Sequence, residues 1–345
     1  MKIENQNGSW VFITPIYNLR LHSAVNEELR IDRVTFISSR KLKKIRNRLG
    51  IDRKVINELQ RKWDIKKYVD TFQTFAILRI GGEPAKIKTD SFRLVHDELL
   101  ILATSQLFFQ NRSYTGFIGF FGENNSSSTQ HLFLESNKKY FSYGEQMTRS
   151  PQGLDLDKEW LSFHRYFYFF NLLNVIRSKK GFSSEWREEI KRASVFMGKS
   201  INTSDISSAF LWNMIALEIL LTHQGSSYKS DLPKRIEALL GWFKNWDAEN
   251  YYDNIVRVYA LRSAFVHDGN ETSITKKDLL FTDVLLFNVL WNIIKNISFF
   301  SSKNKVIDFT KDYEARKYLR LKRGKNPKLY FADNKGYSKQ DLAEI

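Results

Sequence analysis

Three side chains in the second half of the chain can stabilise negative charge or move protons: Glu218, Arg262 and His267. Glu218 lies in LWNMIALEILL, residues 211–221, which is apolar nearly all round. A carboxylate in that setting needs a cation, hydrogen-bond donors or a proton. Arg262 shares a predicted helix face with apolar residues of 251–267, so we expect a buried or half-buried Glu218–Arg262 pair. Such a pair could equally serve only to tie two helices together.

His267 follows Arg262 by five residues and precedes Asp268-Gly269-Asn270, a helix-stop signal. In a continuous helix that step separates two side chains by ~140° around the axis. We therefore expect the helix to end near Val266, so that His267 can turn toward the arginine. Its free pKa of ~6.5 suits proton transfer at neutral pH. The alternative is a helix-end histidine that interacts with terminal carbonyls.

The segment VYALRSAFVHDG, residues 258–269, resembles the Arg-x(4–6)-His motif of the HEPN superfamily, and most of all its ApeA-like branch. The resemblance covers about residues 155–297, where the order of the predicted helices also fits. It implies a metal-independent endoribonuclease formed by a homodimer, with no cofactor. It further implies an abortive-infection effector of bacterial antiphage defence, set off by a phage-derived or protein trigger, with tRNA as a candidate substrate.

Carried over by position, Arg262 would hold the scissile phosphate and His267 would assist proton transfer. Ser263 occupies a position that is often Asn, Asp or His in the superfamily, and Glu218 would orient Arg262. The products would be a 2′,3′-cyclic phosphate and a 5′-hydroxyl. The His-x-Tyr ending of some HEPN toxins is absent, since His267-Asp268-Gly269 stands there. Regulation by tyrosine modification at that site is therefore not supported.

The composition narrows the classes of partner and of chemistry. Lysine and arginine number 54 against 38 acids, a net charge of +16 over 345 residues, which attracts polyanions. The charge favours nucleic acid or an anionic membrane surface as the partner, and the motif favours RNA. The most apolar stretch, residues 279–294, is too short to span a bilayer, and we expect no membrane partner. Cysteine is absent, which excludes thiol chemistry. The histidines are scattered, so we expect no metal site, and a cytoplasmic location is the default.

The length predicts about two domains in an α+β chain. Residues 1–150 are predicted to be a strand-rich module, a possible sensor, with a basic helical insertion over 41–68 and a linker over 142–155. The strands are expected at residues 10–19, 32–39, 72–80, 92–104, 114–122 and 130–136.

Residues 151–300 are predicted to be an all-α bundle, because the apolar period there changes to 3.6. The family resemblance implies that this bundle is HEPN-like. Thr275 and Asp278 resemble a helix-starting capping box. Helices are expected at residues 157–176, 184–196, 205–222, 232–246, 251–266 and 275–297.

Two cationic runs could contact nucleic acid: residues 40–67 and the tail 301–345. The tail interleaves cations with aromatic residues, a composition typical of a single-strand grip, although a solvated basic surface is equally consistent with it. Competing functions are a non-catalytic RNA-binding or dimerisation scaffold and, with less support, a DNA-directed regulator. The tail aromatics are Tyr313, Tyr318, Tyr330, Phe331 and Tyr337.

Overall fold

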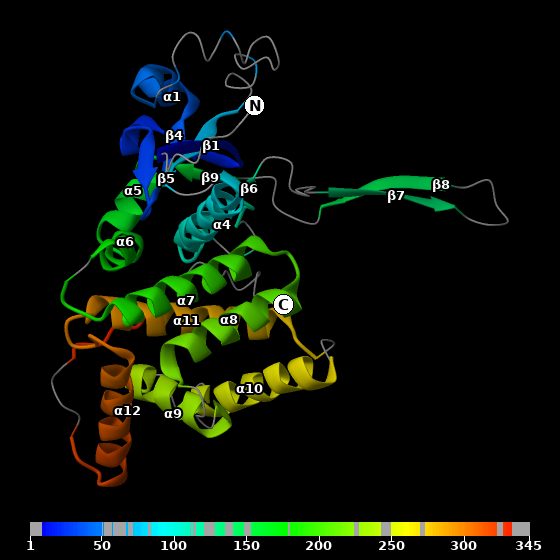
Figure 1. Cartoon of the computed structure of the whole chain (residues 1–345). Helices are drawn as coiled ribbons and strands as arrows, with labels where there is room; N and C mark the ends of the chain where they lie inside the picture. The colour runs from blue at the N-terminus through cyan, green and yellow to red at the C-terminus, as the bar shows by residue number, and fades with distance from the viewer. Residues whose placement is uncertain are drawn as a thin grey trace. The chain divides into compact units, whose positions relative to one another are not determined.

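The computed structural model shows an α+β protein (Figure 1), as the sequence predicted, and divides into two compact units, Met1–Phe163 and His164–Ile345. The expected boundary near residue 150 lies before this division, because the strand Leu154–Leu156 pairs with Leu19–Leu21 in unit 1. The structure describes residues 9–49, 51, 57, 67, 72–81, 84–110, 112, 115–120, 128–134, 141–147, 153–178, 180–223, 228–242, 250–269, 273–322 and 327–332.

Unit 1 is built on a five-stranded antiparallel sheet. Side chains alternate between the two faces of each strand, and each face packs against one helical layer. Two further strand pairs belong to this unit, one parallel (β2 with β9) and one antiparallel (β7 with β8). In spatial order the sheet is β3 (Glu28–Arg30), β4 (Val34–Ser38), β5 (Thr74–Gly81), β1 (Ser9–Tyr17) and β6 (Gly119–Phe120); the pairs are β2 (Leu19–Leu21), β9 (Leu154–Leu156), β7 (Ser128–Leu134) and β8 (Phe141–Met147).

One face of the sheet packs against α4 (Pro84–Ala103), and this corrects the strand expected over residues 92–104. The apolar run reads as a strand because it is dense in Leu and Val. Its buried positions nevertheless include Ser91, Val95, Glu98 and Leu102, which share one helical face at spacings of three and four. Glu98 is fully buried there, and its carboxylate accepts hydrogen bonds from three backbone N–H groups of the β3–β4 turn.

The opposite face of the sheet is covered by α1 (Ser39–Ile45) and the 3-10 helix η2 (Arg46–Leu49), as Figure 1 shows for α1. They are the described start of the helical insertion predicted over 41–68; residues 52–56, 58–66 and 68–71 lie outside the described residues. Residues 148–152 of the predicted linker do so as well. Two further 3-10 helices in this unit are η1 (Ser23–Val25) and η3 (Thr104–Gln106).

Unit 2 is helical, and its most apolar helix, α8, packs between α7 and α11. The expected first helix, 157–176, is broken at residues 166–168, because the bend lets Tyr168 bury its ring against Phe287 while Tyr166 faces solvent. The helices are α5 (Lys158–Arg165, which crosses the division), α6 (Phe169–Arg177), α7 (Ser184–Asn202), α8 (Ile206–Leu221), α9 (Tyr228–Leu240), α10 (Tyr251–Asp268), α11 (Lys276–Lys295) and α12 (Lys303–Tyr318).

Part of the predicted tail is a helix. The sequence analysis did not predict it, because the many charged residues of the segment obscure its apolar positions. Helix α12 buries Lys303, Val306, Ile307 and Thr310 at helical spacing, and its other cations lie on the exposed side. Lys317 of α12 forms an ion pair of 2.6 Å with Glu237 of α9. The start of the cationic tail is therefore a packed element of unit 2.

Three asparagines of α11 hold an extended segment of the tail, residues 327–332, against the bundle. Asn288, Asn292 and Asn296 stand one turn apart on the same helix face. Because each side-chain amide has both a donor and an acceptor, it can pair with backbone as a neighbouring strand would. Their amide nitrogens donate to the carbonyl oxygens of Ala332 (3.0 Å), Tyr330 (2.8 Å) and Lys328 (2.9 Å), in that order.

Of the aromatic residues expected to grip RNA, Tyr318 is 87% exposed and Tyr330 is 37% exposed, whereas the ring of Phe331 packs edge-on to Tyr251. Tyr337 lies outside the described residues. Among the helices that the structure describes, none combines the length and the apolar character needed to cross a membrane.

Candidate functional site

Two helices of unit 2, α8 and α10, position the candidate site. Asp205 caps the N-terminus of α8 by accepting a hydrogen bond from the Ser208 N–H at 2.8 Å. The helix is apolar on nearly all sides because it is covered by α7, α9 and α11. Glu218 lies one turn before its C-terminus and therefore enters a largely apolar environment.

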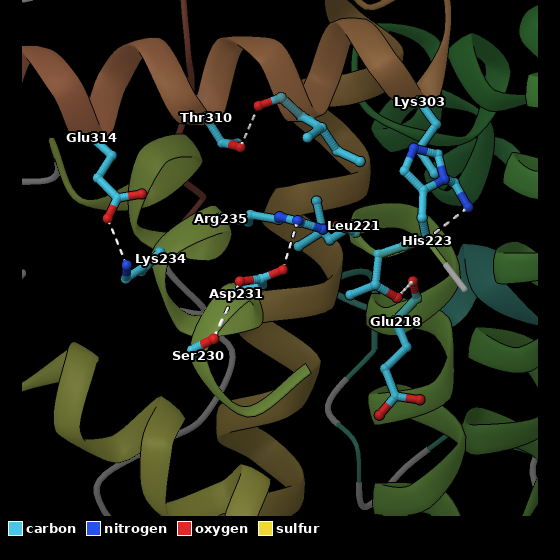
Figure 2. A network of polar contacts seen from close by, with 12 residues as sticks. Glu218, Leu221, His223, Ser230, Asp231, Lys234, Arg235, Lys303, Thr310 and Glu314 are labelled. Atoms are coloured by element: carbon cyan, nitrogen blue, oxygen red, sulfur yellow. Dashed lines mark hydrogen bonds and ion pairs between the residues drawn. The ribbon is translucent and has the colours of Figure 1, made fainter. Parts of the chain in front are cut away.

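The C-terminus of α8 is stabilised by cations from other helices, which fixes the turn that carries Glu218 (Figure 2). A guanidinium N–H of Arg235 donates to the Leu221 carbonyl, and Lys303 Nζ donates to the Thr222 carbonyl at 3.2 Å. Positive groups at this position also complement the helix dipole. The Glu218 carboxylate points away from this network in Figure 2, toward α10.

Glu218 and Arg262 form the ion pair that the sequence predicted. Arg262 Nη2 lies 3.0 Å from Glu218 Oε2, and the side chains are 19% and 13% exposed, respectively. The pair is thus largely, but not completely, removed from water. Burial raises the pKa of the Glu218 carboxyl above its ordinary value, while the charge and the hydrogen bond of Arg262 oppose that rise.

The hydrogen-bonding capacity of this pair is only partly used. Glu218 Oε1 and Arg262 Nε are both buried and have no hydrogen-bond partner among the described residues. A buried polar atom without a partner costs free energy, so such atoms in a native protein call for a reason. One reason is that the pair is built to receive another oxygen or donor from a bound molecule.

His267 is not brought next to Arg262 within one chain. Helix α10 continues to Asp268, beyond the end expected near Val266, because Gly269 adopts a left-handed conformation and its N–H bonds to the Ala264 and Phe265 carbonyls. His267 therefore lies in the last helical turn, exposed, ~140° around the axis from Arg262. The structure gives no contact between the two side chains.

Ser263 follows Arg262 on α10 and is partly exposed. Its hydroxyl makes no hydrogen bond to any residue that the structure describes, so its predicted role as the polar neighbour of the arginine stays a prediction. No group of three histidine or carboxylate side chains gathers in a metal-binding arrangement within the described ranges.

The sequence reasoning missed a second arginine–carboxylate pair on α10. Arg257 Nη2 lies 2.6 Å from Oδ1 of Asp278, whose side chain is 3% exposed. Thr275 and Asp278 form the predicted capping box at the start of α11. Arg257 directly precedes the buried Val258 and its side chain is half exposed, so the helix pattern gave no signal for this pair.

Comparisons with known proteins do not add a relative. No protein-family model, no curated protein and no solved structure matches the chain. The function is therefore inferred from the Glu218–Arg262 pair, its surroundings and the charge of the chain.

Proposed function

We propose that this protein is a metal-independent endoribonuclease of the HEPN type. The observation that carries the proposal is the Glu218–Arg262 pair, a guanidinium held on a bundle helix by a largely buried carboxylate with hydrogen-bonding atoms left over. The net charge of +16 supports a polyanionic substrate. Antiphage abortive infection is the setting that the family resemblance suggests, with tRNA among the candidate substrates.

In the proposed reaction the ribose 2′-oxygen attacks the adjacent phosphorus while the bond from phosphorus to the 5′-oxygen breaks. The 2′-hydroxyl loses its proton and the leaving 5′-oxygen gains one, which yields a 2′,3′-cyclic phosphate and a 5′-hydroxyl. Arg262 would stabilise the extra negative charge on the phosphate oxygens. Glu218 is a positioning residue, because it holds the guanidinium by one nitrogen and leaves the rest of it to face the phosphate.

His267 would move the proton in this reaction, and we propose that a second copy of the chain supplies it. Arg262 and His267 lie on different sides of one helix, so one chain does not present both to one phosphate. A homodimer with α10 near the two-fold axis would place His267 of one copy opposite Arg262 of the other. Ser263, beside Arg262, would lie at the same junction.

Incubation of total RNA with the purified protein in EDTA tests the proposal. Arg262→Ala and His267→Ala should each reduce cleavage by roughly 100-fold or more, because each removes charge stabilisation or proton transfer. Arg257→Ala is the matched control, since Arg257 lies on the same helix and also pairs with a buried carboxylate. Full activity in folded Arg262→Ala and His267→Ala proteins would exclude both residues from catalysis.

The separation of His267 from Arg262 within one chain favours a second candidate, a non-catalytic RNA-binding or dimerisation scaffold. This function requires no convergence of the two side chains. It predicts RNA affinity that falls steeply with salt, because phosphate contacts release counterions, without any chain scission. The EDTA incubation distinguishes the two, since only the enzyme produces new 5′-hydroxyl ends.

A further inference from the structure

An open pocket of about 380 Å³ lies in unit 1, between the sheet and the α1–η2 layer. Its floor is apolar and consists of Ile37 and Ile77 from the sheet with Ile45 and Leu49 from the helical layer. Ile37 and Ile77 are buried, while the other two are partly exposed. The volume falls within the range of sites that hold small molecules, which typically combine apolar walls with a few polar groups.

The pocket follows from the register of three strands. Arg30 of β3 pairs with Thr35 of β4, and Thr35 pairs with Ile77 of β5. Directly paired residues project from the same face of a sheet, and so do residues two apart on one strand. Arg79, two residues from Ile77 on β5, therefore joins Arg30 on the face that carries the pocket. Arg33 lies in the turn between β3 and β4 and also lines the pocket.

These three arginines have no carboxylate partner among the described residues. Arg30 Nε donates to the Asp32 carbonyl at 2.7 Å, and Arg79 Nη2 donates to the Arg48 carbonyl at 3.3 Å. The Arg33 side chain forms no hydrogen bond or ion pair within the part of the chain that the structure describes. Guanidinium groups left in this state can bind phosphate oxygens in pairs.

One acid also lines the pocket, and a lysine already binds it. Glu28 Oε2 lies 2.6 Å from Lys41 Nζ on α1. The side chains that line the pocket therefore carry 3 − 1 = +2 charges, and the only acid among them has its own cation. The local field favours an anion over a cation.

The turn that carries Arg33 is held rigidly by the buried Glu98. Its Oε2 accepts hydrogen bonds from the N–H groups of Asp32 and Val34, and its Oε1 accepts one from Arg33 N–H, all at 2.9 Å. Three hydrogen bonds to one side chain fix the backbone of the turn. The Arg33 guanidinium therefore projects from a preorganised base, which lowers the entropy cost of binding an anion.

We propose that this pocket binds a nucleoside phosphate, with the phosphate groups on Arg30, Arg33 and Arg79 and the nucleoside against the isoleucine and leucine floor. A free phosphate would use only the rim, whereas the floor offers apolar contact to a flat base. The site belongs to unit 1 and is independent of the proposed RNA chemistry, so the two proposals stand or fall separately.

Isothermal titration of the full chain with ADP, in parallel with inorganic phosphate and with adenosine, tests the site. ADP should bind, and each of Arg33→Ala and Arg79→Ala should weaken it by about tenfold. Thr35→Glu, which introduces a carboxylate beside the arginines, should weaken it further. Arg93→Ala is the matched control, because Arg93 is an exposed arginine of the same unit that lies on α4, outside the pocket.

Arg262→Ala should bind ADP like the wild type, which separates this site from the candidate nuclease site. The assignment would be overturned by three results: no heat of binding with ADP and with the other nucleoside diphosphates, equal weakening by Arg93→Ala, or phosphate alone binding as tightly as ADP. RNA binding through Arg33 and Arg79 without affinity for ADP would also overturn it, in favour of an extended RNA surface. Unchanged urea midpoints of the variants exclude unfolding as the cause.

Discussion

The two arginine–carboxylate pairs of α10 differ in how completely their hydrogen-bonding atoms are satisfied. Toward the N-terminal end Arg257 binds Asp278 at 2.6 Å, and toward the C-terminal end Arg262 binds Glu218 at 3.0 Å. Asp278 also accepts hydrogen bonds from the N–H and the hydroxyl of Thr275. Glu218 Oε1 and Arg262 Nε have no such partners in the described part of the chain.

The pKa values of the two carboxyls shift in opposite directions, because the two sites differ in the hydrogen-bond donors that oppose the effect of burial. Burial tends to raise the pKa of Asp278, but the hydrogen bonds from Thr275 and Arg257 and the charge of Arg257 outweigh it, so the pKa is lowered. Burial raises the pKa of Glu218 and Arg262 alone does not cancel it. A completed network indicates a structural cap, whereas an incomplete one indicates a site that awaits a ligand.

The largest expected difference between the two pairs is in stability. Arg262→Met removes the one cation that pairs with Glu218 among the described residues, and it should lower the free energy of unfolding by about 2 kcal/mol at neutral pH. Arg257→Met should cost about 1 kcal/mol or less, because Thr275 still satisfies Asp278 and Arg257 is half exposed. Urea unfolding of unit 2 measures both changes in the free energy of unfolding. Equal losses in the two variants would contradict the proposed difference between the two pairs.

Activity should separate the two carboxylates as well. Glu218→Gln keeps the shape but weakens the hold on Arg262, so RNA cleavage should fall about tenfold and its pH dependence should change. Asp278→Asn should leave cleavage within about twofold. Cleavage rates across a pH series measure the effect. A Glu218→Gln enzyme with the wild-type rate and pH profile would assign Glu218 a purely structural role.

Thr275→Ala tests whether the capping box explains the lowered pKa of Asp278. The variant loses the hydroxyl that caps α11 and should be less stable by about 1 kcal/mol. The pKa of Asp278 should rise, because one of the donors that hold it ionised is gone. NMR titration of the Asp278 carboxyl measures that pKa, and an unchanged value would assign the shift to Arg257 and to the backbone N–H of residue 275, which the variant keeps.

The smallest expected effect is the pH dependence of folding stability, which should have opposite signs for Glu218 and Asp278. Because the folded-state pKa of Glu218 is raised, wild-type stability falls as pH rises from the ordinary glutamate pKa through the folded one, so Glu218→Gln should gain relative to wild type. The folded-state pKa of Asp278 is lowered, so its contribution is present above the ordinary aspartate pKa and is lost on acidification. Asp278→Asn should therefore lose relative to wild type as pH rises, and a shared sign would contradict the assignment.

The sequence predicted the Glu218–Arg262 pair because a carboxylate in an apolar helix needs a partner. It did not predict the direction of His267, because that depends on whether α10 stops at Val266 or runs on to the Gly269 cap. The Leu-rich run at residues 92–104 of α4 predicts a strand, because it hides the helical period. Glu98 is the residue in that run that indicates a specific buried contact, since a lone acid among apolar residues must find hydrogen-bond donors.

The arginine pocket of unit 1 could not be predicted from the sequence, for a different reason. Arg30 and Arg33 flank a turn, but Arg79 is far away in the chain and joins them only through the register of β4 with β5. Strand register arises from tertiary packing, which a single sequence does not reveal. The strands themselves at β1, β4, β5 and β7 were predicted, because their alternation is local.

Complementation between two inactive variants tests most directly the claim that Arg262 and His267 act together from different copies. Co-expression of differently tagged Arg262→Ala and His267→Ala chains, followed by purification on both tags, isolates the mixed assembly. In a two-fold dimer one of the two sites then keeps both side chains, so cleavage of RNA in EDTA should return to about half of the wild-type rate. A mixed assembly as inactive as its parents would contradict a site shared between two copies.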